Sequence, residues 1–230
     1  MDIIIIGAGG HGRVVLDIVR AAGLYRPVGF IDANPLLQGE RIDGLRVIGD
    51  PSNLGLLKER GIEGAIVAIG DNATRRRYAK AVDQCDMTLI NAIHPSANVA
   101  STCTVGRNVV VAAGAVACAH CQIGDSAILN TACIVDHESI VGHSAHVCPG
   151  ARLAGRVIVE PGAFVGIGAT VIQMVRIGAD AVVGAGAVVI QDVPASSTVV
   201  GVPARIIKRR PSEAVKFPLQ PAEELQEATV

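Results

Sequence analysis

From Ile93 onward, hydrophobic residues recur along the chain with a period of six. Every sixth position from Ile93 to Val189 carries Ile, Leu or Val, with Ala117 as the one exception. The fourth position after each of these leading residues is mostly small, as at Ala97 and Cys103. An α-helix repeats every 3.6 residues and a strand every two, so neither element explains this pattern.

A triangular coil does explain a period of six. Each hexad then forms one short strand and one corner, and three hexads close a turn of 18 residues. Successive turns stack through strand hydrogen bonds, about 4.8 Å apart. The leading residues fill the interior, and Gly or Asn near the corners tolerates a positive φ. The sequence therefore predicts a parallel β-helix of hexapeptide repeats over residues 92–208.

The first 91 residues instead alternate short apolar runs with helical patterns. Strands are predicted at 2–6, 28–31, 64–69 and 88–91, and helices at 12–22, 52–60 and 73–84. This alternation is typical of a small parallel α/β sheet. We therefore expect a Rossmann-like α/β domain at 1–91, the β-helix at 92–208 and a C-terminal tail at 209–230.

Gly7, Gly9 and Gly12 form a G-x-G-x-x-G pattern between the first strand and the first helix, and Asp32 lies 20 residues past Gly12. This pattern is typical of dinucleotide-binding domains. A complete NAD domain, however, has two such halves and needs about 130 residues or more. Only one half precedes the coil, so the pattern favours a nucleotide diphosphate-sugar over NAD, although a packing-only role stays open.

Candidate nucleotide-sugar contacts lie at the ends of two predicted strands. Gly9, Gly10 and His11 open the first helix, whose N-terminus suits a phosphate. Gly70 and Asn72 follow a later strand, and such strand ends meet at one edge of a parallel sheet. Asp32 is either a turn acid that caps the stretch DANP or a contact to a hydroxyl or base.

Composition and charge exclude several other classes of protein. Half of the residues are hydrophobic, but only 2% are aromatic, which suits a narrow core of Val, Ile, Leu and Ala. The net charge of −1 does not predict binding to nucleic acid. No apolar run is long enough for a membrane span, and we expect a soluble, cytoplasmic protein with free thiols. The run Arg75 to Arg77 reads as a solvated helix face.

Four stretches occur together in this order: GAGGHGRVV, AIGDN, NTACIVDHESIVGHSAHVCPGARLAGRVIV and VVGVPARIIK. Their combination resembles bacterial sugar acyltransferases, which join a small Rossmann-like domain to a left-handed β-helix. That family includes nucleotide-linked 4-amino-sugar N-acetyltransferases of the bacillosamine and perosamine type and sialic-acid O-acetyltransferase-like proteins. The resemblance covers residues 1–208.

The resemblance implies roles for several residues of the coil. It implies that His137 is the general base, that Glu138 orients it, and that His146 lies near the donor thioester. It also places Asn130 and Thr131 near the acceptor sugar. Acetyl-CoA is expected along the coil toward its C-terminal turns, in a cleft between subunits of a homotrimer. The candidate contacts to acetyl-CoA, besides His146, are Gly155, Ile167, Ala185 and Gly201.

The chemistry of these residue types agrees with that assignment. A neutral imidazole can accept a proton near neutral pH, and a neighbouring carboxylate fixes its tautomer. A backbone N–H near Gly155, or His146, could stabilise the oxyanion of a tetrahedral intermediate. A metal held by His137, His143 and His146 is not expected, because successive faces of the coil do not converge.

The sequence thus predicts an acetyl-CoA-dependent N-acetyltransferase that acts on the 4-amino group of a nucleotide-linked amino-deoxysugar, without a metal or NAD. Two other readings stay open. The same histidine would serve a sugar or sialic-acid O-acetyltransferase, and a non-catalytic solenoid scaffold would need no base. The glycine loop favours an acceptor that carries a nucleotide.

Overall fold

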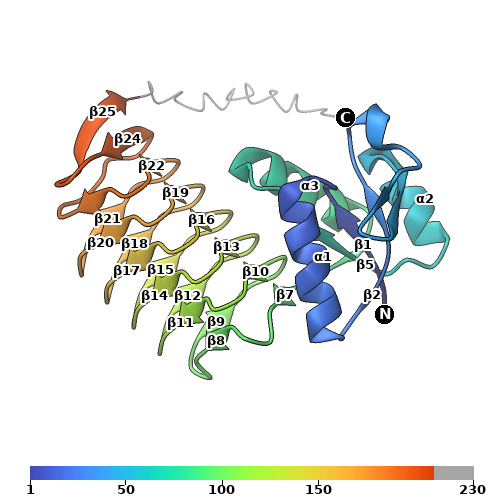
Figure 1. Cartoon of the computed structure of the whole chain (residues 1–230), viewed down its shortest axis with the longest axis horizontal. Coiled ribbons are helices and arrows are strands. Elements are labelled where there is room, and N and C mark those ends of the chain that lie inside the picture. Colours follow the sequence, from blue (N-terminus) through green and yellow to red (C-terminus); the bar gives the residue numbers. More distant parts are fainter. Residues whose placement is uncertain (210–230) are drawn as a thin grey trace, which may run out of the picture.

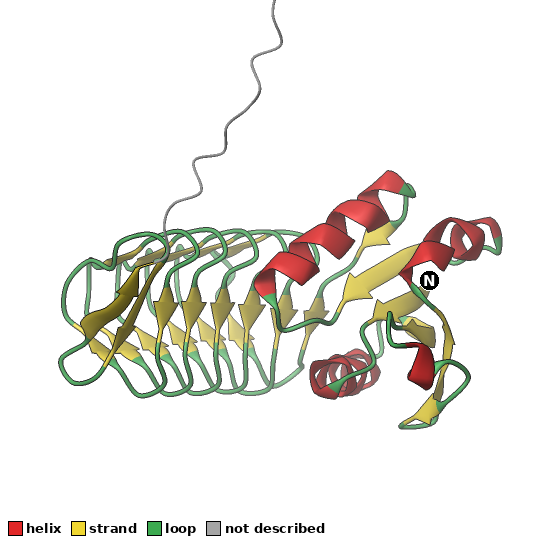
Figure 2. Ribbon diagram, turned by 90° about the horizontal axis from the view of Figure 1, so that it is seen from above, coloured by secondary structure: helices red, strands yellow, loops and turns green. Residues whose placement is uncertain are grey.

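The computed structural model describes residues 1–209 and has two parts (Figure 1). An N-terminal α/β domain packs against the first turns of a left-handed parallel β-helix, as Figure 2 shows from a second direction. Of the predicted tail, residues 210–230 lie outside the described part. Within the described part, no helix is both long enough and apolar enough to cross a membrane.

The N-terminal domain is built on a six-stranded sheet with the order β3-β4-β2-β1-β5-β6, in which only the β3–β4 pair is antiparallel. The strands are β1 (Asp2–Ile6), β2 (Arg26–Ile31), β3 (Arg41–Ile42), β4 (Leu45–Gly49), β5 (Gly64–Val67) and β6 (Thr88–Leu89). The helices are α1 (Gly10–Ala22), α2 (Leu54–Glu59) and α3 (Asn72–Gln84), with 3-10 turns η1 (Pro35–Leu37) and η2 (Pro51–Asn53).

The predicted α/β architecture is confirmed, but two strands of this sheet were not foreseen. Strand β3 has two residues, and β4 buries only two of its five residues, Val47 and Gly49. Strand β3 is too short to show a pattern, and the apolar residues of β4 do not form the buried run that marks β1 and β5. Strand β4 nevertheless pairs in parallel with β2, so the strand end at Gly49 joins the edge where the nucleotide residues were expected.

The predicted hexads form 17 two-residue strands, and each strand ends on a leading residue. They are β7 (Ala92–Ile93), β8 (Asn98–Val99), β9 (Thr104–Val105), β10 (Val110–Val111), β11 (Val116–Ala117), β12 (Gln122–Ile123), β13 (Ile128–Leu129), β14 (Ile134–Val135), β15 (Ile140–Val141), β16 (His146–Val147), β17 (Arg152–Leu153), β18 (Ile158–Val159), β19 (Phe164–Val165), β20 (Thr170–Val171), β21 (Arg176–Ile177), β22 (Val182–Val183) and β23 (Val188–Val189). Strand β24 (Ser197–Val200) continues the coil, and β25 (Arg205–Arg209) pairs with it in the antiparallel sense.

From β7 to β20, each strand pairs in parallel with the strand 18 residues later, as in the register Val110↔Ile128. The coil therefore has three faces, of eight, six and five strands. We call the eight-stranded face, with the order β25-β24-β22-β19-β16-β13-β10-β7, the junction face, because the N-terminal domain covers part of it. Outward side chains of this face, including Val110 and Ile128, pack into the core of that domain.

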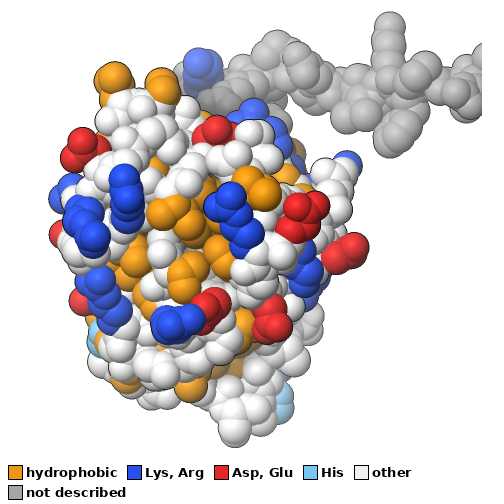
Figure 3. All heavy atoms as spheres, turned by 90° about the vertical axis from the view of Figure 1, so that its right-hand side faces the viewer, with side chains coloured by type: hydrophobic (Ala, Val, Ile, Leu, Met, Phe, Trp, Pro, Cys, Tyr) orange, Lys and Arg blue, Asp and Glu red, His pale blue; other side chains and the backbone are white. Residues whose placement is uncertain are grey.

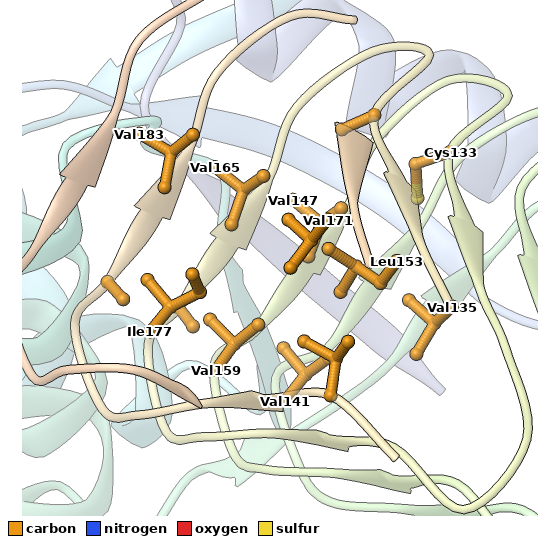
Figure 4. Packing of buried hydrophobic residues seen from close by; sticks show 14 of the residues in the cluster. Cys133, Val135, Val141, Val147, Leu153, Val159, Val165, Val171, Ile177 and Val183 are labelled. Atoms are coloured by element: carbon orange, nitrogen blue, oxygen red, sulfur yellow. The ribbon is translucent and has the colours of Figure 1, made fainter. Parts of the chain in front are cut away.

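Leading residues point into the coil and stack in columns (Figure 4). Val147, Val165 and Val183, for example, are fully buried on one face, one above the other. The small fourth residues, such as Ala163 and Ala181, fill the space beside them and are also fully buried. A prism this narrow has no room for aromatic rings in its interior, which accounts for the composition.

Close stacking of the turns fixes the residue at several corners. Many hexads carry glycine directly after the leading residue, as at Gly142. A Cβ at Gly142 would lie 2.7 Å from the nitrogen of Pro161 in the next turn, far inside contact distance. Each corner also holds one residue with positive φ per turn, among them Glu138 (58°) and Arg156 (61°).

The interior columns should dominate the stability of the coil. Val159→Ala removes two buried methyl groups from a fully buried site and should lower the free energy of unfolding by about 2 kcal/mol. Val188→Ala is the matched control, because Val188 points outward and is half-buried. Chemical denaturation of both variants measures the difference, and equal losses would contradict this packing.

Candidate active site

The glycine loop after β1 opens a cavity of about 440 Å³ at the carboxyl ends of β1, β2 and β5. Gly9, Gly10, His11, Asp32 and Gly70, all predicted nucleotide-sugar contacts, line it. The structure therefore brings together predicted residues that are up to 61 positions apart in the sequence (from Gly9 to Gly70).

The glycines of the loop divide into two kinds. Gly7 has a φ of 104°, and a Cβ at Gly12 would lie 2.0 Å from the carbonyl oxygen of Gly7, so these two glycines permit the strand-to-helix crossing. A Cβ at Gly9 or Gly10 would meet nothing within 4 Å. Helix α1 begins without a side-chain cap, so its first N–H groups are available to an anion in the cavity.

Asp32 stabilises the loop from the end of β2. One carboxylate oxygen accepts a hydrogen bond from the N–H of Ala8 (2.7 Å), and the other accepts one from the N–H of Asn34 (2.8 Å). The capping of the DANP turn is thus present. A contact from Asp32 to a hydroxyl or base of a ligand stays a prediction.

His146 comes from strand β16 of the junction face and meets the N-terminal domain. Its ring centroid is 6.3 Å from that of His11, and it packs edge-on against Phe164 at 5.2 Å. The Nε2 atom lies 3.0 Å from the amide nitrogen of Asn130. Asn130 uses its oxygen to accept a hydrogen bond from the N–H of Thr131, so its amide nitrogen is the donor to His146.

Two ring nitrogens at this junction are buried without a hydrogen-bond partner: Nε2 of His11 and Nδ1 of His146. Burial, with a smaller contribution from the charge of Arg75, lowers the pKa of each imidazole from 6.5 to about 4. Both histidines are therefore neutral near pH 7. His11 lines the cavity, but its unpartnered Nε2 atom is itself buried.

Arg75 is fully buried, so the prediction of a solvated helix face is wrong for this residue. Its guanidinium donates to the carbonyl oxygens of Ser126 (2.7 Å), Ser144 (2.8 Å) and Ile69 (2.8 Å). The neighbours Arg76 and Arg77 are exposed, as the sequence predicted. The charged run therefore has one residue turned into the contact between the two parts of the chain.

Asn72 also bridges the two parts. Its amide nitrogen donates to the carbonyl oxygens of Gly162 (2.8 Å) and Ala163 (3.3 Å), and its oxygen accepts from Arg75 (2.7 Å). These bonds occupy the amide on the coil side, and Asn72 does not line the glycine-loop cavity. A contact to the nucleotide-sugar is untested and stays a prediction.

His137 lies at a different corner of the coil, between β14 and β15. Its Nδ1 is 3.2 Å from Oε2 of Glu138, and the same oxygen accepts a hydrogen bond from Nε of Arg156 (2.8 Å). Arg156 and His137 both lower the pKa of the Glu138 carboxyl, the Arg156 hydrogen bond being the larger cause. Arg156 was not predicted, although it lies one full turn of 18 residues after Glu138.

Gly155 leaves space for the imidazole of His137. A Cβ at Gly155 would lie 2.4 Å from Nε2 of His137, so any side chain there would displace the ring. The Nδ1–Glu138 contact leaves Nε2 as the nitrogen available to accept a proton. Within the described residues, the N–H of Gly155 makes no hydrogen bond, which leaves it free for an oxyanion.

The other predicted acetyl-CoA contacts lie at another corner. Ile167 follows β19 and Ala185 follows β22, so they stack one turn apart, and both are exposed. Gly201 follows β24 on the same face. The six-stranded face separates this corner from that of His137 and Gly155. One chain therefore does not bring all the predicted donor contacts together, and His146 lies with the glycine-loop cavity instead of beside His137.

The described residues contain neither a cluster of metal ligands nor a disulfide. They contain no group of three or more His, Cys, Asp or Glu side chains arranged to hold a metal. All six cysteines are free thiols, and burial raises the pKa of Cys133 and Cys148 to about 12.

Viewed from the N-terminal domain, the surface carries charges of both signs around a hydrophobic area (Figure 3).

Comparisons with known proteins agree with this arrangement. The family described as the PglD N-terminal domain matches residues 2–82. Perosamine N-acetyltransferase from Caulobacter crescentus, solved with CoA and GDP-perosamine, is 42% identical, with a TM-score of 0.87 over 90% of this chain and 97% of that one. The acetyltransferase domain of PglB from Neisseria gonorrhoeae, solved with acetyl coenzyme A, is 34% identical, with a TM-score of 0.84 over 90% and 98%.

WeeI from Acinetobacter baumannii, 22% identical with a TM-score of 0.66, shares the fold over 90% of this chain and 100% of its own. A comparison with curated protein sequences gave no match. From the identity and coverage of the first two structures, the chain belongs to the bacterial sugar acyltransferases that join a PglD-type N-terminal domain to a hexapeptide β-helix. The predicted family and enzyme class are thereby confirmed.

The buried histidines should make the stability depend on pH. Both imidazoles have a pKa of about 4 in the folded protein, against about 6.5 in an unfolded chain. Between these values the unfolded chain binds protons that the folded protein does not. The free energy of unfolding should therefore fall as the pH drops from 6.5 toward 4, by up to about 1.4 kcal/mol per pH unit for each histidine.

Urea denaturation at pH 7 and pH 5 measures this effect. His146→Asn should reduce the loss of stability on acidification. His120→Asn, at an exposed histidine, is the control and should leave the loss unchanged. A wild-type protein that is as stable at pH 5 as at pH 7 would contradict the burial of neutral histidines.

Proposed function

We propose that this protein transfers an acetyl group from acetyl-CoA to the 4-amino group of a nucleotide-linked amino-deoxysugar. The observation that carries the proposal is the open glycine-loop cavity of the N-terminal domain, whose lining residue His11 has its ring centroid 6.3 Å from that of His146 of the coil. A nucleotide diphosphate held there would direct its sugar toward the coil. The relative that is 42% identical binds CoA and GDP-perosamine, a ligand of this class.

The acceptor's phosphates would bind at the N-terminus of α1, near Gly9 and Gly10. The unpaired N–H groups and the partial positive charge of the helix end favour an anion at that point. The side chain of His11 lines the cavity next to this helix end. Asn130 and Thr131, on the coil beside His146, are then close to the sugar.

His137 is the proposed general base. Its Nε2 accepts a proton from the amine while the amine nitrogen bonds to the carbonyl carbon of the thioester. Glu138 holds the Nδ1–H and stabilises the imidazolium that forms. The N–H of Gly155, which makes no hydrogen bond among the described residues, would stabilise the oxyanion. The carbon–sulfur bond then breaks, and the CoA thiolate takes up the proton held by the imidazolium, which restores neutral His137.

The predicted donor contacts divide between two corners of the coil, which supports a site shared between chains. In a homotrimer, the corner with Ile167 and Ala185 of one subunit can face the corner with His137 of its neighbour, and acetyl-CoA would lie in the cleft between them. The sparse charge of the coil supports the same arrangement, because only ten charged residues lie in 93–194.

His137→Asn should abolish most of the acetyl transfer. We expect kcat to fall by about 10²-fold or more, because no other base replaces the imidazole. The melting temperature should stay nearly unchanged, since the side chain is exposed. Release of free thiol from acetyl-CoA, with GDP-perosamine and related amino-sugars as acceptors, measures the rate. Full activity in this variant would exclude His137 as the base.

Gly9→Leu should weaken the binding of the nucleotide-sugar acceptor but not that of acetyl-CoA. The side chain would fill the open part of the cavity, so the KM of the nucleotide-sugar should rise by tenfold or more while that of acetyl-CoA changes little. Gly55→Leu is the control, since Gly55 is also exposed with open space around it but lies on α2, away from the cavity. An equal rise in both KM values would count against a nucleotide site here.

A further inference from the structure

Arg75 is the most completely buried charged side chain of the described part, and it makes no ion pair within hydrogen-bond distance there. Its guanidinium donates instead to the carbonyl oxygens of Ser126, Ser144, Ile69, Gly70 and, at 3.5 Å, Ala145, and to the amide oxygen of Asn72. A charge buried in this way is costly unless each donor has a partner, and here each of the three nitrogens has at least one.

The bonds of Arg75 connect three segments that are distant from one another in the sequence: residues 69–70, Ser126 and residues 144–145. Nη1 donates to Ile69 (2.8 Å) and Gly70 (3.1 Å), in the turn that forms one wall of the glycine-loop cavity. Nη2 donates to Ser144 (2.8 Å) and lies 3.5 Å from the oxygen of Ala145, the backbone that leads into His146. The wall of the cavity and the histidine next to it are therefore held by one planar group.

These contacts require the planar, forked guanidinium of an arginine and not only a positive charge. Nη1 and Nη2 point to different segments while Nε reaches a third, at Ser126. A lysine ammonium is a single point charge on a flexible stem and cannot reach all three at once. The positive charge has a separate effect, because it faces the imidazoles of His11 and His146 and lowers the pKa of both. The other charges near Arg75 are Asp71 and Arg76 of the same helix.

We propose that Arg75 is a positioning residue for the acceptor site, which fixes the Gly70 turn against the backbone before His146 so that the cavity is formed before the nucleotide-sugar binds. This inference rests on the proposed function. It assigns to a buried residue that contacts no ligand the task of setting acceptor affinity. Acetyl-CoA should be little affected, because its expected contacts other than His146 lie at corners of the coil that Arg75 does not touch.

Three variants separate the fork from the charge. Arg75→Lys keeps the charge and loses the fork, and Arg75→Met loses both. Arg76→Met is the control, because Arg76 is exposed and its contact to Asp180 spans 3.6 Å. For each variant, calorimetry measures the affinity for GDP, UDP, dTDP and CoA, and NMR follows the titration of His146.

In Arg75→Lys, the affinity for the preferred nucleotide should fall by tenfold or more, with CoA affinity and the titration of His146 nearly unchanged. In Arg75→Met, the pKa of His146 should also rise, because a nearby positive charge is gone. Arg76→Met should resemble the wild type in each measurement. If Arg75→Met does not fold, Arg75→Lys still decides the question.

Unchanged nucleotide affinity in Arg75→Lys would overturn the inference, and so would an equal loss of nucleotide and CoA affinity, which indicates a general structural role. If the wild type binds none of the three nucleotides, the proposed acceptor class is wrong. The positioning role rests on that acceptor and is then wrong with it, because the titration of His146 reports only the charge of Arg75.

Discussion

The contact between helix α3 and one corner of the coil fixes the position of the N-terminal domain relative to the coil. That corner presents Asn108, Ser126, Ser144, Gly162 and Asp180, one per turn, each with a positive φ. Arg75 donates hydrogen bonds to the carbonyl oxygens of Ser126 and Ser144, and Asn72 donates one to that of Gly162. The side-chain oxygen of Asn108 accepts a hydrogen bond from the N–H of Val67 at the end of β5 (2.8 Å).

This contact determines where a ligand can bind. The 18-residue repeat sets the spacing of the corner carbonyls, and the first turn of α3 matches that spacing with polar donors. The end of β5 and the turn at Gly70 are thereby held beside the backbone that leads into His146. The cavity, which residues of the N-terminal domain line, therefore lies next to the junction face of the coil. The acceptor site thus depends on the packing of two parts that each have their own hydrophobic core.

The β-helix and the glycine loop could be predicted from the sequence, because the hexad period and the glycine pattern are local signals. The period fixes which residues point inward, as at Val147 and Val165. The role of Arg75 could not be predicted, since a run of three arginines on a helix reads as a solvated face until the coil is placed against it. Arg156 was missed for a related reason. Its partner Glu138 is 18 residues away, and only the turn length of the coil connects them.

The position of His146 relative to His137 is also a property of the assembled fold. The two histidines are nine residues apart in the sequence, yet His146 lies on the junction face and His137 lies at the corner between the other two faces. Sequence motifs cannot tell whether such residues act in one chain or across neighbouring chains.

The measurement that tests the account most directly is mass spectrometry of the nucleotide-sugar after incubation with the protein and acetyl-CoA. The account predicts a nucleotide amino-sugar that gains one acetyl group, attached to nitrogen as an amide that resists hydroxylamine. An acetyl group attached to a hydroxyl, or the absence of an acetylated nucleotide-sugar across GDP-, UDP- and dTDP-linked 4-amino-sugars, would contradict it.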